Sequence, residues 1–248
     1  MSILSNKIAL VTGASRGIGA ATAKLLAKQG AKVAISYNRS KEQAQKVVEE
    51  INAVGGEAVA FQADGSAPDA PSKLINDVTS HWQSGIDILV NNAGVFSTGS
   101  LAESGVEVYE KNFNLNVRGV YETTRAAVPH LNKNGRIINI GSSVAHFAFP
   151  GASAYGATKA AVAGLSRSWA KELAANQITV NTVHPGSINT DMNPDVPEND
   201  FATFQKSLNP LGRYGTPHEI AAAVAFLASP DAGFITGSEL TVDGGLTA

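Results

Sequence analysis

The sequence lacks cysteine, a strong net charge and any long apolar run, and each absence excludes a class of protein. Without cysteine there is no disulfide framework, no thiolate metal site and no thiol nucleophile. A formal net charge of −2 over 248 residues gives no electrostatic basis for binding nucleic acid or an anionic membrane. The five histidines, at positions 81, 130, 146, 184 and 218, show no metal-ligand spacing, so we expect no metal site.

No apolar segment is long enough to cross a bilayer. The longest run near the C-terminus, residues 220–228, is far shorter than a membrane-spanning helix. The first seven residues lack a basic region followed by an apolar signal stretch. We therefore expect a soluble cytoplasmic protein. No repeat, linker or break in composition divides the chain, and 44% hydrophobic residues supply an ample core, which predicts a single domain over residues 1–248.

Short apolar runs alternate with helical patterns along the chain, which predicts an α/β fold. Runs such as Ile8–Val11 are continuously apolar, as in strands of a parallel sheet buried on both faces. Capping boxes starting at Ser40 and Thr216 predict two helix starts. The expected strands are 8–11, 32–37, 57–62, 86–90, 135–140, 178–183 and 238–242; the expected helices are 20–29, 40–54, 69–82, 106–131, one headed by Tyr155, and 216–228.

A glycine-rich turn lies between the first strand and the first helix. Gly13 permits a tight turn, Gly17 lets the backbone approach a pyrophosphate, and Gly19 lets helix and strand pack closely. The helix N-terminus offers unpaired N–H groups to phosphates. A structural glycine turn is the alternative, but the strand before it and the helix after it favour dinucleotide binding.

The residues after the second strand indicate which dinucleotide binds. Many dinucleotide folds carry an acidic residue there for the ribose hydroxyls of NAD, whereas this chain has Tyr37-Asn38-Arg39-Ser40. Arg16 and Arg39 can bind a 2′-phosphate that a carboxylate would repel. We therefore predict NADP(H) over NAD(H); the alternative is that Arg39 is a solvated loop charge.

Further polar residues follow the later strands. Asp64 can bond an adenine amino group or cap a helix. Asn91-Asn92-Ala93-Gly94 ends the fourth strand, where ligands bind in open α/β sheets; the asparagines can hold neighbouring backbone, and Ala93-Gly94 leaves room for a cofactor ring. Asn116 is a poor helix-interior residue, so it marks either a kink with a function or an exposed irregularity.

Tyr155 and Lys159 form the strongest candidate for acid–base chemistry. Positions i and i+4 share a helix face, so the two side chains lie together. A neighbouring ammonium favours the phenolate and is expected to lower the tyrosine pKa from about 10. A half-buried tyrosine beside a solvated lysine is the structural alternative. Ser142 precedes Tyr155 by thirteen residues, far enough for a loop to bring the two hydroxyls together.

The polar, proline-containing segment 193–210 has little core-forming character. It predicts a mobile cover over a site, with a substrate lid near residues 190–213.

In combination these residues resemble the short-chain dehydrogenase/reductase family over essentially the whole chain. The motifs that carry the resemblance are Thr12–Gly19, Asn91-Asn92-Ala93-Gly94, Asn116, Ser142, Tyr155-x-x-x-Lys159 and Pro185-Gly186. The resemblance implies a Rossmann-type, doubly wound parallel sheet of about seven strands in the order 3-2-1-4-5-6-7. It also implies a homotetramer, often packed through the helices that hold Asn116 and Tyr155.

The resemblance also implies a mechanism. Ser142 would polarise a substrate carbonyl, Tyr155 would give the proton, Lys159 would lower the tyrosine pKa and hold the nicotinamide ribose, and Asn116 would anchor a water. The expected catalytic residues are Asn116, Ser142, Tyr155 and Lys159. The expected NADPH/NADP+ contacts are Gly13, Ser15, Arg16, Gly17, Ile18, Gly19, Tyr37, Asn38, Arg39, Ser40, Ala63, Asp64, Gly65, Asn92, Ala93, Gly94, Tyr155, Lys159, Pro185, Gly186, Ile188 and Thr190.

The substrate is expected to be a small ketone, keto ester or aldehyde. The alternative is the family's 3-oxoacyl-carrier-protein reductase branch, which uses basic residues to bind an acidic carrier. Here segment 129–134 has one lysine, Lys171 replaces an arginine typical of that branch, and segment 95–100 lacks its Thr-Arg-Asp pattern. Phe96, Phe147 and Phe149 suggest an apolar pocket wall or a core role. A non-catalytic NADPH-binding protein is a third possibility, which the intact catalytic set argues against.

Overall fold

The computed structural model describes residues 2–248, and its centre is one sheet of seven parallel strands. The strand order is β3-β2-β1-β4-β5-β6-β7, which confirms the predicted doubly wound, Rossmann-type topology. β1 pairs with β2 on one side and β4 on the other, so the order reverses there. The strands are β1 (Ile8–Val11), β2 (Lys32–Tyr37), β3 (Glu57–Gln62), β4 (Ile86–Asn91), β5 (Leu131–Ile140), β6 (Thr179–Pro185) and β7 (Glu239–Val242).

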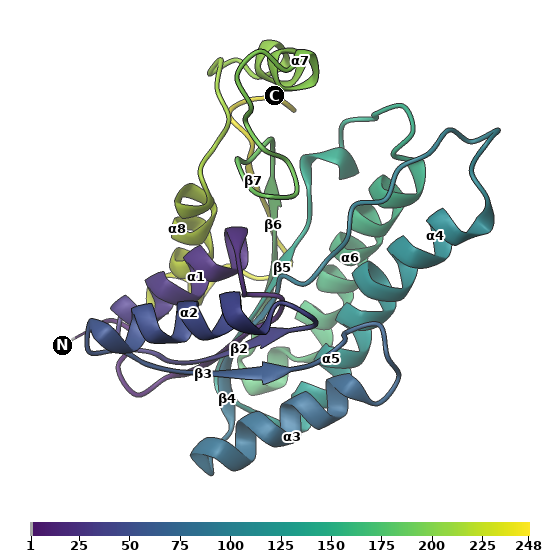
Figure 1. Ribbon diagram of the computed structural model, residues 1–248. Helices are drawn as coiled ribbons and strands as arrows, with labels where there is room; N and C mark the ends of the chain where they lie inside the picture. The colour runs from purple at the N-terminus through teal and green to yellow at the C-terminus, as the bar shows by residue number, and fades with distance from the viewer. Residues whose placement is uncertain (1) are drawn as a thin grey trace.

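Helices cover both faces of the sheet, as Figure 1 shows. One face carries α1 (Gly17–Lys28), α2 (Lys41–Ala53) and α8 (Pro217–Ala228); the other carries α3 (Ala70–Trp82), α5 (Val120–Ala127) and α6 (Ser153–Glu172), with α4 (Val106–Phe113) packed beside α6. Successive residues of β1 alternate between the two cores: Ala9 and Val11 belong to the first, and Ile8 and Leu10 to the second. Burial of all four explains why the strand reads as a continuous apolar run.

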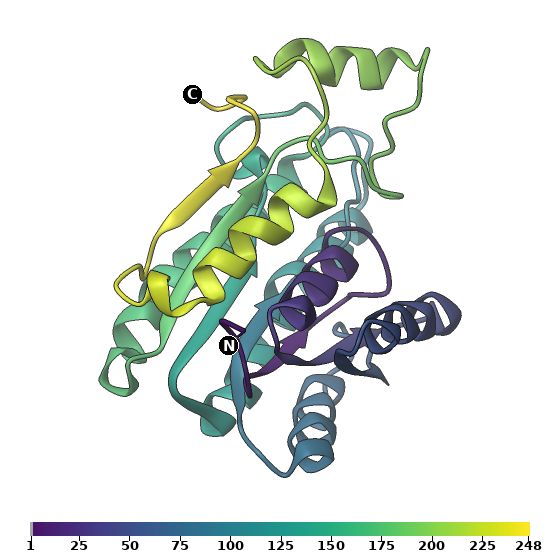
Figure 2. The ribbon, with the colours of Figure 1, turned by 90° about the vertical axis from the view of Figure 1, so that its left-hand side faces the viewer.

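The helix that precedes α8 packs on neither face of the sheet (Figure 1; Figure 2). α7 (Asp200–Leu208) lies beyond the carboxyl ends of the strands, near the C-terminus (Figure 1; Figure 2). Its N-cap Asn199 accepts a hydrogen bond from the Ala202 amide. The predicted lid segment therefore contains a capped helix; its mobility remains a prediction.

The prediction of a single helix over 106–131 is wrong, because the helix is interrupted in its interior and ends before residue 131. After α4 the chain makes a π-helical turn, η1 (Asn114–Gly119), before α5 begins; a 3-10 turn, η2 (Val128–His130), follows. Pro129 cannot continue an α-helix, and Leu131 already pairs with Ile86, so β5 starts four residues before the expected strand. The π-turn contains Asn116, whose contacts are described below.

The two predicted capping boxes have opposite outcomes. The Thr216 side chain accepts from the Glu219 amide while the Glu219 carboxylate accepts from the Thr216 amide, so this box is confirmed. Ser40 precedes α2 but its side chain makes no capping hydrogen bond. Its ψ of 63° lies outside the extended region that directs a capping hydroxyl toward the helix amides. The predicted helix start at Ser40 is therefore confirmed, whereas its capping box is wrong.

The remaining short elements are 3-10 turns: η3 (Ser143–Ala145), η4 (Ala174–Asn176) and η5 (Pro230–Ala232). Within residues 2–248, every helix is too short or too polar to cross a bilayer.

Candidate active site

A cavity of about 730 Å³ opens at the carboxyl edge of the sheet, where the strand order reverses. All the residues predicted to contact a cofactor line it, from Gly13 in the first turn to Thr190 after β6. Ser142, Tyr155 and Lys159 of the predicted catalytic set line it as well. Asn116 does not, because it is fully buried behind the wall. The fold therefore brings residues from distant parts of the chain to one cavity.

The glycine-rich turn is held against the end of β4. Gly13 has a φ of +63°, and a Cβ there would lie 2.8 Å from the Ala93 Cα, so only glycine fits. The Asn92 amide donates to the carbonyls of Thr12 and Gly13 at 2.8 and 3.0 Å. A Cβ on Gly19 would lie 2.5 Å from that same Asn92 amide nitrogen. Asn92 thus holds neighbouring backbone as the sequence suggested.

The start of α1 can receive an anion. Its N-cap is Arg16, whose side chain makes no capping hydrogen bond, and its first residue is Gly17, with a φ of +57°. The first amides of a helix lack partners within the helix and carry the positive end of its dipole. This cradle fits a pyrophosphate, as the chemistry of a dinucleotide requires.

The far end of the cavity is formed by Tyr37, Asn38, Arg39 and Ser40 after β2. Arg16 pairs only loosely with Asp191 at 3.6 Å, and both side chains are exposed. Among residues 2–248, Arg39 forms no ion pair within 4 Å. Two guanidinium groups with weak or no pairing at this end fit a cofactor that carries an extra phosphate.

Asp64 lies beside this end and closes a turn. Its Oδ1 accepts hydrogen bonds from the Ser66 amide at 3.0 Å and the Ser66 hydroxyl at 2.6 Å. These bonds, helped by Asn38 and Arg39, lower the pKa of Asp64. α3 begins only at Ala70, so the alternative that Asp64 caps that helix is wrong. Its contact with an adenine stays a prediction.

Tyr155 and Lys159 lie one turn apart on α6, and Lys159 is not solvated as the structural alternative required. The Lys159 side chain is 5% exposed, and its Nζ donates to the Ile140 carbonyl at 2.9 Å. Nζ also lies 5.6 Å from the centroid of the Tyr155 ring. The same ring meets Phe96 edge to face, with 4.8 Å between the centroids. Packing therefore fixes the phenol at the cavity wall.

The expected lowering of the Tyr155 pKa is wrong. Burial raises the pKa of Tyr155 to about 12, although the Ser142 hydroxyl acts in the opposite direction. Burial lowers the pKa of Lys159 to about 8. Desolvation disfavours both charged forms and is the main cause of both shifts. Tyr155 therefore holds its proton at neutral pH, which is the state that a proton donor needs.

Ser142 lies two residues after the end of β5 and is fixed through its backbone. Its hydroxyl accepts from the Val144 amide at 3.3 Å. Its carbonyl oxygen lies 2.8 Å from His184 Nδ1, and its amide nitrogen lies 3.2 Å from the same atom. His184 is fully buried on β6, and its Nε2 lies 3.1 Å from Glu239 Oε2 on β7. Burial is the main cause that lowers the pKa of His184.

Sequence reasoning missed this support for Ser142. His184 lies in a strand, Glu239 lies 55 residues later in another, and no local motif joins them. Only the parallel pairing of β6 with β7 brings them together.

Asn116 lies in the π-turn and is fully buried, so it is not an exposed irregularity. Its Oδ1 accepts from the Val95 amide at 2.8 Å, and its Nδ2 donates to the Val95 carbonyl at 2.9 Å and to Thr158 Oγ1 at 3.2 Å. Thr158 in turn donates to the Tyr155 carbonyl at 2.6 Å. Asn116 thus ties the loop after β4 to the helix of Tyr155. The expected water-anchoring role stays a prediction.

The rest of the cavity wall is apolar. Phe96, Phe147 and Phe149 line it, which favours the pocket wall over a core role. Phe201 of α7 meets Phe149 edge to face at 6.0 Å between centroids. The lid also lines the cavity through Met192, Asn193, Gln205 and Leu208. A phosphate cradle and an apolar chamber therefore meet at Ser142 and Tyr155.

Comparisons with known proteins agree with this geometry. The family profile described as "Enoyl-(Acyl carrier protein) reductase" matches residues 13–247. A 3-oxoacyl-[acyl-carrier-protein] reductase of Synechocystis sp. is 43% identical, with 99% of each chain covered. A short-chain dehydrogenase/reductase from Serratia marcescens is 43% identical with a TM-score of 0.96, covering 99% of this chain and 100% of its own. A short-chain dehydrogenase from Burkholderia cenocepacia, solved in complex with NADP, is 45% identical with a TM-score of 0.96 and the same coverage.

Proposed function

Because the chain belongs to the short-chain dehydrogenase/reductase family of oxidoreductases, we propose that it reduces the carbonyl of a small ketone, keto ester or aldehyde with NADPH. The observation that carries the proposal is the position of Ser142 and Tyr155, where the phosphate cradle meets an apolar chamber. A small carbonyl compound needs few polar contacts beyond its oxygen, and this chamber offers mainly aromatic and aliphatic side chains.

The side chains have separable roles in such a reaction. NADPH supplies a hydride when bound, and the reduced carbonyl oxygen needs a proton. The Ser142 hydroxyl would donate a hydrogen bond to that oxygen, and the protonated Tyr155 would deliver the proton. Lys159 would lower the cost of the tyrosinate that remains, because its ammonium lies beside the same ring. Asn116 would hold a proton-supplying water near Lys159. Both side chains lie beside Gly94, because a Cβ there would be 3.2 Å from Asn116 Oδ1 and 3.7 Å from Lys159 Nζ.

Selectivity for NADPH would come from the end of the cavity formed after β2. Segment 37–40 offers one guanidinium and no carboxylate, and Arg16 adds a second from the first turn. The Burkholderia cenocepacia relative was solved with NADP, and a relative from a metagenomic library, 41% identical, was solved with NADPH.

A 3-oxoacyl-carrier-protein reductase is the second candidate, and the names of the relatives favour it. Proteins of that description from Synechocystis sp. and Staphylococcus aureus are 43% and 42% identical. An acidic carrier would need a basic surface near the cavity. The exposed segment 129–134 carries only Lys133, and nearby Arg125 is paired with Glu122 at 2.8 Å. We therefore rank carrier-protein reduction second.

One assay separates the two candidates. NADPH and NADH would be offered to the purified protein with simple ketones, keto esters, aldehydes, diketones and a 3-oxoacyl thioester, following cofactor oxidation. We expect fast NADPH-dependent turnover of small carbonyl compounds and poor turnover of the thioester. A strong preference for the thioester would make the carrier-protein reductase correct. Binding of NADPH with no turnover of any substrate would refute both.

The assigned proton donor is tested by Tyr155→Phe. The variant removes only the hydroxyl and keeps the ring that packs on Phe96. We expect turnover to fall by about 10²–10⁴-fold while NADPH binding, followed by its fluorescence, is unchanged. Tyr109→Phe, on the exposed surface of α4, is the matched control and should keep full activity. Turnover within threefold of the wild type in Tyr155→Phe would remove this residue from the mechanism.

We also propose a homotetramer assembled through the helices around Asn116 and Tyr155. Tyr109 and Tyr121 expose half of their surface or nearly so on α4 and α5, an apolar area for contact with a second copy. Light scattering during size-exclusion chromatography should give four times the mass of 25.6 kDa. A monomeric mass at micromolar concentration would refute this assembly.

A further inference from the structure

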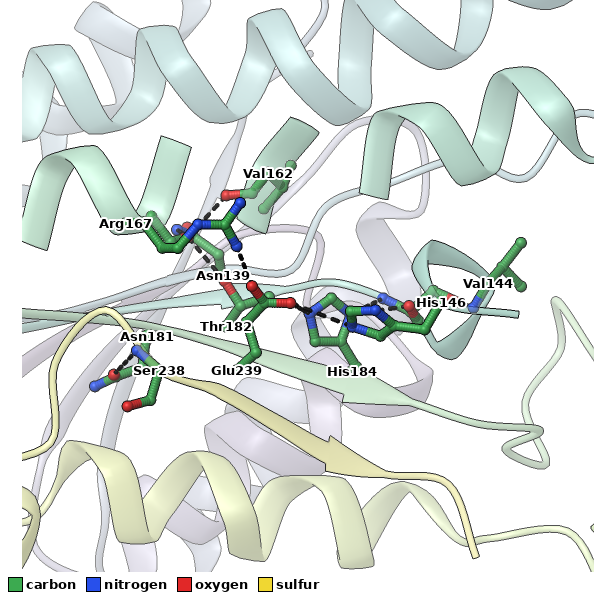
Figure 3. Close-up of polar contacts among 12 residues, drawn as sticks. Asn139, Val144, His146, Val162, Arg167, Asn181, Thr182, His184, Ser238 and Glu239 are labelled. Carbon is green, nitrogen blue, oxygen red and sulfur yellow. Dashed lines mark hydrogen bonds and ion pairs between the residues drawn. The ribbon is translucent and has the colours of Figure 1, made fainter. Parts of the chain in front are cut away.

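Three side chains capable of binding a metal meet behind Ser142, outside the cavity. They are His146 after η3, His184 on β6 and Glu239 at the start of β7. Figure 3 shows the Glu239 carboxylate between Arg167 on one side and the two imidazole rings on the other. None of the three side chains lines the cavity of the proposed active site. The cluster therefore requires an explanation of its own.

The distances within the cluster suit a metal ion. Glu239 Oε2 lies 3.2 Å from His146 Nε2 and 3.1 Å from His184 Nε2. Metal–ligand bonds of about 2.0–2.1 Å place neighbouring tetrahedral ligands about 3.3 Å apart. All three ligand atoms lie within 4.8 Å of one another. The two imidazole nitrogens can approach further, because the His146 side chain is 44% exposed and free to turn inward.

The surroundings orient His184 as a metal ligand. Its Nδ1 lies 2.8 Å from the Ser142 carbonyl oxygen and 3.2 Å from the Ser142 amide nitrogen. The shorter contact favours Nδ1 as a donor to the carbonyl, which leaves the lone pair on Nε2. That lone pair faces the carboxylate oxygen of Glu239, an acceptor that brings no hydrogen of its own. Two acceptors at 3.1 Å need a proton or a metal ion between them. A ligand histidine whose other ring nitrogen donates to a backbone carbonyl is the usual arrangement in metal sites.

Arg167 is the charge that opposes a cation here. Its guanidinium pairs with Glu239 Oε1, so Oε2 is the oxygen left for the imidazoles. A carboxylate can bind an ion through one oxygen while the other accepts a hydrogen bond. The guanidinium is 56% exposed, so solvent screens its repulsion in part. It should nevertheless weaken metal binding. A variant that lacks this guanidinium should therefore bind the metal more tightly.

We propose that His146, His184 and Glu239 bind a divalent transition-metal ion of the zinc class, with water as the fourth ligand. Two imidazoles and one carboxylate suit zinc, cobalt, nickel or copper better than magnesium or calcium, which take mainly oxygen ligands. The exposed side of His146 provides the entry path and the place for the water. The three residues are separated by 38 and 55 positions in the sequence, so their spacing does not indicate a metal site.

The site is joined to the proposed active site through one hydrogen bond. A metal on Nε2 holds the His184 ring, whose Nδ1 contacts the backbone of Ser142. Metal binding itself requires neither NADPH nor a substrate, so the inference stands or falls independently of the proposed function.

The test uses the full-length, untagged protein, Co²⁺ absorption spectroscopy and competition for Zn²⁺ against a chromophoric chelator. We expect one ion per chain and a tetrahedral Co²⁺ spectrum. His146→Ala should lower the affinity by about tenfold or more, and it risks little of the fold because the residue is exposed. His130→Ala, an exposed histidine outside the cluster, is the matched control and should bind like the wild type.

Arg167→Met supplies a readout of opposite sign. Removing the guanidinium frees Glu239 and should raise the affinity by about tenfold. Absence of stoichiometric binding to the wild type would overturn the proposal. Equal affinity of His146→Ala and the wild type would overturn it as well, as would unchanged or weakened binding in Arg167→Met.

Discussion

Substitution of Lys159 by methionine tests whether a buried ammonium is held beside the catalytic tyrosine. The side chain is 5% exposed, and burial lowers its pKa from 10.5 to about 8. That difference of 2.5 units, at 1.36 kcal/mol per unit, is a cost of roughly 3 kcal/mol for the charged form in the folded protein. Below pH 8 both states carry the charge, so the folded state bears the full cost.

The sign of the pH dependence follows from proton binding. Between pH 8 and 10.5 the unfolded chain binds more protons at this residue than the folded protein does. The free energy of unfolding therefore rises with pH, by about 2 kcal/mol between pH 7 and pH 9.5 from this residue alone. Lys159→Met lacks the titrating group, so its stability relative to the wild type should decline by that amount over the same interval.

Urea denaturation followed by tryptophan fluorescence measures the effect, since Trp169 is buried on α6. Both proteins would be unfolded at pH 7, 8.5 and 9.5. Measurements above pH 10 are avoided, because the raised pKa of Tyr155, about 12, makes stability fall from pH 10 upward. A stability difference between the two proteins that stays constant from pH 7 to 9.5 would refute the desolvated ammonium.

Three other substitutions test the cavity and its supports. Arg39→Ala should raise the KM for NADPH by about tenfold and leave that for NADH unchanged; an equal effect on both would remove Arg39 from phosphate recognition. Gly19→Ala should destabilise the protein by about 1–3 kcal/mol in urea denaturation, because its Cβ meets backbone at 2.8 Å, whereas Gly164→Ala, with 3.8 Å of clearance, should not. Asn116→Ala leaves the Val95 amide and carbonyl without partners and should cost about 1–3 kcal/mol; an unchanged urea midpoint would contradict this.

The sheet could be predicted because its strands are buried on both faces. β1, β4 and β6 show no exposed position. β1 reads as a continuous apolar run, whereas Asp87 interrupts β4 and Asn181 and His184 interrupt β6. The strand order came only from the resemblance of the motifs to a family. The start of β5 was missed because Leu131 to Asn134 is half-buried or exposed and carries no such run.

The cavity was predicted residue by residue, but its electrostatics were not. Spacing alone places Tyr155 and Lys159 on one helix face, whereas the depth of that face in the structure decides the direction of both pKa shifts. Ser142 was found through its place after a strand. Its partner His184, and the Glu239 that contacts His184, were not found, because a contact between separate parallel strands leaves no pattern in the sequence.

The π-turn at 114–119 sets the rotational phase between α4 and α5. A π-turn holds one residue more than an α-helical turn, and one residue corresponds to a rotation of about 100°. Asn112 of α4 holds Ser97, and Asn116 of the π-turn holds Val95, so both asparagines face the same loop. Deleting one residue between them would restore a regular helix and turn Asn112 away from that loop. The π-turn thus fixes the number of residues between α4 and α5. We expect this segment to tolerate a substitution more readily than an insertion or a deletion.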